Sequence, residues 1–137
     1  MAANISPIFG LSVKNSWSGA ITAADTSLTA PSTGGAQVMV AGSEGAFVKR
    51  LLVKPLGTNV ATVLRVFLNN GSAVGTAANT ALIKEITLPA TTISQIAAGI
   101  DYEIPLNLQI QSGYKLYAAI GTGIAAGVIV TAEFADY

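Results

Sequence analysis

The sequence contains no cysteine and no histidine, and only 10% of its 137 residues are charged. The absence of thiols excludes disulfides and cysteine nucleophiles, and the absence of imidazole excludes the Ser-His-Asp and Cys-His arrangements and the usual zinc ligand sets. The seven basic residues are balanced by seven acidic ones. Proteins that bind nucleic acid normally carry a basic excess. We therefore expect no nucleic-acid partner, no metal, no cofactor and no enzymatic activity.

Hydrophobic residues make up 51% of the chain, so its surface has little charge with which to prevent self-association. This composition favours a subunit of a permanent assembly over the alternative, a monomer with an uncharged β surface. The length is that of one domain. The longest uncharged apolar run, Leu116–Ala132, contains three glycines and alternates as strands do. A membrane helix needs about 20 apolar residues, so we expect no membrane partner.

Alternation of apolar and polar residues with a period of two dominates the chain and predicts about eight β-strands. In the clearest case, Tyr102–Ile110, apolar residues face one way and mostly polar ones the other, with Pro105 suited to an edge or a bulge. The other expected strands cover Lys14–Thr22, Ala36–Ala41, Ala46–Lys54, Val60–Asn69, Ala81–Leu88, Lys115–Ile120 and Val128–Phe134. One helical turn is expected within Thr91–Gly99, with Thr92 as its cap. The pattern predicts a single-domain, all-β antiparallel β-sandwich or jelly roll.

The first 13 residues do not fit this pattern, because Pro7 and Gly10 interrupt an otherwise apolar segment. We expect residues 1–13 to form an irregular N-terminal arm and residues 14–137 to form the β-sandwich. An apolar arm needs a surface to dock on. That surface is either the arm's own sandwich or a neighbouring subunit, and the candidate contact residues are Ile5, Ile8, Phe9 and Leu11.

Arg50 and Lys54 are the other candidate contacts, because they share one face of an expected strand. They could bind an acidic protein surface or form an ordinary solvated edge. Lys49 belongs to the same basic cluster but faces the opposite way unless a bulge intervenes.

Two carboxylates, Asp101 and Glu103, also share a strand face, at about 7 Å from each other. Such a pair could serve acid–base chemistry on a glycosidic bond, as in a small β-fold hydrolase, or begin a calcium site. A solvated strand face explains the pair better, because the nearby sequence supplies no third acid.

An alternative interpretation is a carbohydrate-binding module, which would use exposed aromatic rings as platforms for sugars. The candidate rings are Trp17 and Tyr117. The segment Gly121–Ala126 matches a dinucleotide-binding fingerprint by chance, because a strand and not a helix follows it. We expect its glycines only to supply the positive φ angles of a turn.

Five segments carry a resemblance to a known family. They are Leu56–Gly71, Glu85–Thr92, Pro105–Leu108, Ser112–Ala118 and Ala135–Tyr137. In this order they resemble small proteins encoded in tailed-bacteriophage genomes, often beside capsid genes, a family that looks like capsid decoration, or cement, proteins. The resemblance covers about Trp17 to Tyr137 and includes no catalytic motif.

The resemblance implies a jelly-roll subunit of the virion, usually a homotrimer, that binds the major capsid protein. It would lie on the outer capsid surface at junctions between capsomers and stabilise the shell. Symmetric trimers suit three-fold junctions, and three linked contacts can each be modest. The other interpretations are a carbohydrate-binding module and another small head or tail protein of a phage.

Overall fold

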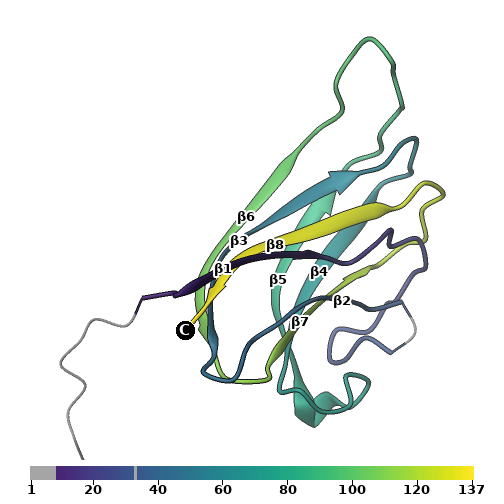
Figure 1. The fold of residues 1–137 in the computed structure, drawn as a ribbon. Helices are drawn as coiled ribbons and strands as arrows, with labels where there is room; N and C mark the ends of the chain where they lie inside the picture. Colours follow the sequence, from purple (N-terminus) through teal and green to yellow (C-terminus); the bar gives the residue numbers. More distant parts are fainter. Residues whose placement is uncertain (1–8, 33) are drawn as a thin grey trace, which may run out of the picture.

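The computed structural model describes residues 9–32 and 34–137 and contains eight β-strands and one short 3₁₀ helix in that part of the chain (Figure 1). The elements are β1 (Ser12–Trp17), β2 (Ala36–Val40), β3 (Ala46–Pro55), β4 (Thr62–Asn69), η1 (Ala77–Asn79), β5 (Thr80–Leu88), β6 (Tyr102–Ile110), β7 (Lys115–Ile120) and β8 (Val128–Asp136). No helix in the described part is long and apolar enough to cross a membrane.

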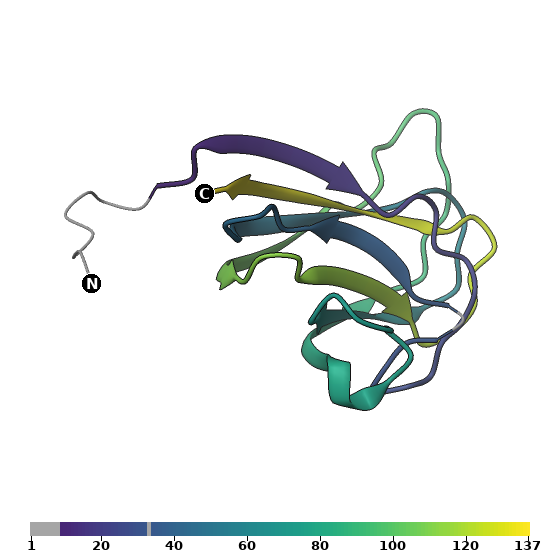
Figure 2. The ribbon, with the colours of Figure 1, turned by 60° about the horizontal axis from the view of Figure 1, so that its bottom comes forward.

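The strands form two antiparallel four-stranded sheets that pack face to face (Figures 1 and 2). One sheet, called here the β1-sheet, has the order β1-β8-β3-β6, and the other, the β2-sheet, has the order β2-β7-β4-β5. Each strand of the first half therefore pairs with its counterpart counted from the end: β1 with β8, β2 with β7, β3 with β6 and β4 with β5. This is the strand order of a jelly roll. The predicted all-β sandwich is confirmed.

The core lies between the two sheets and follows from the period-two pattern. In β8 every second residue from Val128 to Asp136 is buried, and in β4 Leu64 and Val66 are fully buried. The predicted strands Tyr102–Ile110 and Lys115–Ile120 have the bounds that the sequence indicated. The apolar side of each strand faces the opposite sheet, which buries both inner faces at once.

Two local predictions differ from the structure. β1 covers Ser12–Trp17 and not Lys14–Thr22. It begins two residues earlier than expected, because pairing with β8 continues to Asp136, and it ends five residues earlier, shortly before Gly19 with its φ of 71°. The helical turn in Thr91–Gly99 is absent. Thr91 is held instead in a β-bridge with Asn59, and Ser94, not Thr92, caps the bend through its side-chain oxygen.

The outer face of the β2-sheet is covered by the connection between β1 and β2. Asp25 organises this connection: its carboxylate accepts hydrogen bonds from the backbone N–H groups of Ser27, Ser32 and Gly34 at 2.8–3.2 Å. The Asp25 N–H donates to the carbonyl of Ile120 at the end of β7. The connection thus lies against the β2-sheet.

Beneath this cover, side chains are buried outside the sandwich core. Ala119 and Phe67 are fully buried although alternation points them away from the opposite sheet. Ser32 also meets the β4–β5 connection, because a Cβ placed at Gly75 would lie 3.6 Å from its Cβ. Figure 2 shows these two connections side by side. The β2-sheet is therefore buried on both faces around Phe67 and Ala119, on its two central strands.

Candidate functional site

Of the four candidate contact residues in the arm, the structure describes two. Ile5 and Ile8 lie outside the described residues. Phe9 and Leu11 are 70% and 84% exposed. The N–H of Leu11 donates to the carbonyl of Asp136 at 2.8 Å, so the segment leaves the sandwich beside the end of β8 (Figure 2). This end of the molecule presents large apolar side chains to solvent.

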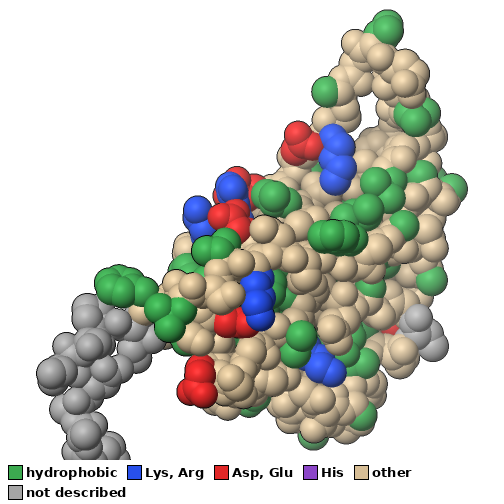
Figure 3. Space-filling view, viewed as in Figure 1, with side chains coloured by type: hydrophobic (Ala, Val, Ile, Leu, Met, Phe, Trp, Pro, Cys, Tyr) green, Lys and Arg blue, Asp and Glu red, His purple; other side chains and the backbone are tan. Residues whose placement is uncertain are grey.

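Arg50 and Lys54 lie on the outer face of the β1-sheet, as predicted, and both are engaged in ion pairs. Arg50 binds Glu133 of β8 through Nε and Glu103 of β6 through Nη1, the latter at 3.2 Å. Lys54 Nζ lies 2.6 Å from a carboxylate oxygen of Asp101. Figure 3 shows blue and red side chains in contact over this face. The arrangement is a solvated ladder of opposite charges and not a free basic patch.

A bulge in β3 adds Lys49 to this cluster. Val48 lies opposite Phe134 and Arg50 opposite Glu133, so two steps along β3 match one step along β8. The extra residue, Lys49, therefore faces outward together with Arg50, and its Nζ lies 3.4 Å from Glu133. The bulge was the condition under which the sequence allowed all three basic residues to share one face.

The Arg50–Glu133 contact shifts both ionisation equilibria. The hydrogen bond from Arg50 lowers the pKa of the Glu133 carboxyl, opposed by partial desolvation and assisted by Lys49. The same hydrogen bond, with a second one to Glu103, raises the pKa of Arg50. Both groups stay charged at neutral pH, which fits a structural pair.

Asp101 and Glu103 are each matched with a cation of β3, on the strand face that the sequence indicated. Both carboxylates point to the outer face of the β1-sheet and are solvent-exposed, with side-chain exposures of 82% and 52%. In the described residues no three His, Cys, Asp or Glu side chains are grouped so that they could hold a metal ion. The pair therefore supports the interpretation as a solvated strand face.

Trp17 and Tyr117 lie on different sheets. Trp17 is 65% exposed on the outer face of β1, whereas Tyr117 is on β7 and its hydroxyl lies 3.4 Å from the side-chain oxygen of Gln37. A sugar-binding platform uses rings that lie on one surface. These two rings cannot form such a platform together.

An apolar surface that the sequence analysis did not single out lies on the β5–β6 connection. Ile93, Ile96 and Ile100 are 61%, 98% and 49% exposed. In Figures 1 and 3 this connection projects from the end of the sandwich. The sequence feature that could have indicated this surface is the presence of three isoleucines in a segment without charged residues, between Glu85 and Asp101. Ile93 and Ile96 belong to the helical turn expected within Thr91–Gly99, so their exposure on an open connection was not predicted.

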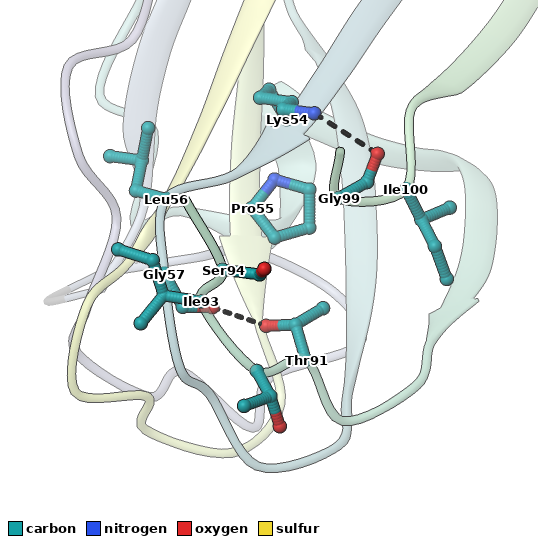
Figure 4. A pocket seen from close by; sticks show the side chains of 10 residues that line it. Lys54, Pro55, Leu56, Gly57, Thr91, Ile93, Ser94, Gly99 and Ile100 are labelled. Carbon is teal, nitrogen blue, oxygen red and sulfur yellow. Dashed lines mark hydrogen bonds between the residues drawn. The ribbon is translucent and has the colours of Figure 1, made fainter. Parts of the chain in front are cut away.

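The base of this projecting connection is tied to the β3–β4 turn. The backbone groups of Thr91 and Asn59 exchange two hydrogen bonds, and the Thr91 hydroxyl donates to the Gly57 carbonyl at 2.6 Å. The N–H of Ile93 donates to the Thr58 hydroxyl at 3.0 Å. A pocket of about 290 Å³ lies between the two segments, with Leu56 and other apolar side chains at its wall (Figure 4). The isoleucines are thus presented on an anchored support.

The glycines of Gly121–Ala126 have a different role from the one predicted. The positive φ angle in this connection belongs to Gly127 and not to Gly121 or Gly123. A Cβ at Gly121 would lie 3.2 Å from the Arg65 guanidinium, and one at Gly123 would lie 3.4 Å from the Thr22 carbonyl. Close approach explains these glycines, and the strand that follows at Val128 confirms that the fingerprint is accidental.

The sequence matches no protein-family model and no curated protein sequence. A solved structure described as the cyanophage Pam1 capsid asymmetric unit matches with 18% sequence identity and a TM-score of 0.44. The match covers 99% of this chain and 94% of the other. A similarity of this size supports no conclusion about the function of this chain.

Proposed function

We propose that this chain is a structural protein of a virion, a capsid decoration (cement) subunit that binds the major capsid protein on the outer surface at junctions between capsomers. The sequence resemblance to decoration proteins suggests the role. The low charge and the exposed apolar side chains support a subunit that is covered in use.

The observation that carries the proposal is the position of the two exposed apolar surfaces. The N–H of Leu11 is bonded at Asp136, the last residue of β8, and the N–H of Leu56 is bonded at Gly127, just before β8 begins. The arm and the β5–β6 connection are therefore separated by the whole length of β8, about 30 Å. A rigid sandwich with an apolar contact at each end can hold two neighbours together, which is what stabilisation of a junction requires.

In this proposal the trimer implied by the resemblance is the capsid-bound state. Three copies at a three-fold junction would place equivalent arms and equivalent β5–β6 connections against the surrounding capsomers. Each contact can be weak, because the three act together. Electron microscopy of decorated capsids would test this state directly: we expect three copies of the jelly roll at each occupied junction.

Co-sedimentation tests the function. The purified chain is mixed with capsids of the virus that encodes it, prepared without this protein, and the bound fraction is measured against concentration. We expect saturable binding and a higher temperature of capsid disruption. Ile96→Ser and Leu11→Ser should each weaken binding by about tenfold or more, because each removes an exposed apolar anchor.

Leu28→Ser is the matched control, because Leu28 is 55% exposed but lies on the connection that covers the β2-sheet. It should bind capsids like the unmodified chain. Absence of saturable binding by the unmodified chain would refute the decoration role. Equal loss of binding in all three variants would refute the assignment of the two apolar ends as the contacts.

A further inference from the structure

The four edge strands of the sandwich differ in how they are protected against pairing with another chain. β6 carries Pro105 and the left-handed Asn107, whose φ is 47°. β2 has five residues and a register shift after Gln37. β5 has a register shift at its pairing with Phe67 and carries two adjacent charges. Prolines, bulges and charges are the usual means by which proteins block edge-to-edge association.

β1 lacks these interruptions. All six of its residues, Ser12–Trp17, pair with β8 in one unbroken register, and no strand of the described chain pairs with its other edge (Figure 2). Its contact with β2 of the other sheet is through a side chain, because the Ser16 hydroxyl donates to the Val38 carbonyl at 2.6 Å. Its single charge, Lys14, is bound to Asp136. An uninterrupted open edge is a template for one more strand.

The hydrogen-bond alternation shows which groups face this open edge. The N–H of Ser18 donates to the carbonyl of Val130, so Ser16 and Lys14 also direct their backbone groups toward β8. The backbone N–H and C=O groups of Val13, Asn15 and Trp17 therefore point outward from the sheet. Their side chains lie on the outer face of the β1-sheet, where Val13 and Trp17 are 78% and 65% exposed.

A second copy of β1, paired antiparallel in one particular register, would form hydrogen bonds with all of these outward-facing backbone groups. When Asn15 lies opposite Asn15 of the other copy, Val13 lies opposite Trp17, and all three outward-facing residues of both strands form hydrogen-bonded pairs. Lys14 then lies opposite Ser16. Moving the register by two residues toward the N-terminus would place Lys14 opposite Lys14 and would need Leu11, whose N–H is already bonded to Asp136.

The outer-face side chains suit this register. A β-branched residue opposite an aromatic one is a stabilising cross-strand pair. Beside Val13 lies a hollow of about 140 Å³, lined by Val13, Phe47 and Ala135 among others. Trp17 of the second copy would extend over this hollow and lose its exposure to water. The surface is therefore complementary to itself.

We propose that two copies of this chain associate through their β1 edges, antiparallel and centred on Asn15, to form one continuous eight-stranded sheet. The contact is two-fold symmetric, as is usual for a self-complementary surface. It does not rest on the proposed function, because it follows from the edges of the sheets alone.

Light scattering across a concentration series tests the association. We expect a mass that rises toward twice 13.9 kDa, together with a blue shift in the emission of Trp17, the only tryptophan. Asn15→Pro removes the central pair of hydrogen bonds and should raise the dissociation constant at least about tenfold. Thr87→Pro is the matched control, because Thr87 is exposed on the open edge of β5. It should leave the dimer intact.

Cross-linking tests the register, because the natural chain contains no cysteine. Asn15→Cys places two sulfur atoms on Cα positions about 5.5 Å apart, within the range of a disulfide. Val13→Cys is the control, because its equivalents would lie about 14 Å apart. We expect a covalent dimer from the first variant only.

A chain that remains monomeric at every concentration would overturn the proposal. So would a trimer in which Trp17 keeps the emission of an exposed indole, or cross-linking that is equal in the two cysteine variants. Each of these outcomes is compatible with saturable capsid binding, so failure of the β1 pairing is distinguishable from failure of the decoration role.

Discussion

The two sheets of the jelly roll differ in what lies on their outer faces. On the β2-sheet, Phe67 and Ala119 point outward and are nevertheless fully buried, because the chain folds its own connection over them. On the β1-sheet, Trp17 and Val13 occupy comparable positions and stay exposed. The connection between β1 and β2 thus covers the outer face of the β2-sheet, whereas none of the described segments covers the outer face of the β1-sheet around Trp17 and Val13. The open face and its edge are where an external partner has room to bind.

The charged residues show the same division. The ion pairs of Arg50, Lys54 and Lys49 all lie on the open β1-sheet, where solvent and salt weaken them. On the covered sheet, Arg65 binds Glu85 and also donates to the carbonyl of Asp25, so its guanidinium joins the sheet to its cover. On the β1-sheet the charged side chains lie in solvent, whereas on the β2-sheet a charged side chain, Arg65, holds the covering connection against the sheet.

The largest expected effect is a difference in stability between a substitution on the covered outer face and one on the open outer face. Phe67→Ala should lower the free energy of unfolding by about 3–5 kcal/mol, the usual cost of truncating a fully buried phenylalanine. Trp17→Ala in dilute protein should cost less than about 1 kcal/mol, because an exposed side chain loses little burial. Urea unfolding followed by circular dichroism measures both. Similar costs for the two variants would contradict the contrast between covered and open faces.

The second prediction concerns the cover itself. Asp25→Ala removes a buried carboxylate that holds three backbone N–H groups and should cost about 2–4 kcal/mol. Hydrogen exchange should increase in the connection and in neighbouring β7. Asp101→Ala is the control, because Asp101 is exposed and its ion pair with Lys54 is worth at most about 1 kcal/mol. If both variants lost the same stability, Asp25 would not organise the cover.

Much of the fold could be predicted from the sequence because it depends on alternation, which is local. On β4, alternation places Phe67 on the face away from the core, so its full burial depends on a separate segment that covers it. The segment that covers it could not be predicted, because Asp25 acts through backbone groups far along the connection. The bulge at Lys49 depends on pairing with β8, which no local pattern shows. Ile96 fits a helical spacing, but the bridge formed by Thr91 prevents a helix there.

The smallest expected effect is the pH dependence of stability that the Arg50–Glu133 ion pair gives to the open face. Arg50 lowers the pKa of Glu133 in the folded chain below its value in the unfolded chain, about 4.3. The folded state therefore binds fewer protons, and the stabilisation is fully present above that pH and is lost as the pH falls through the lowered pKa. Glu133→Gln should be slightly less stable than the natural chain at neutral pH, and the difference should vanish in acid.

Salt provides a second test, because salt screens an exposed ion pair strongly but has little effect on a buried carboxylate held by backbone N–H groups. The difference between the natural chain and Glu133→Gln should shrink in high salt, while the cost of Asp25→Ala should persist. Glu44→Gln is the control for salt, because Glu44 is an exposed carboxylate on the β2–β3 turn and no ion pair is found for it among the described residues; its cost should not depend on salt. A Glu133→Gln cost that is independent of both pH and salt would mean that Glu133 acts through packing, and the open face would then resemble the covered one.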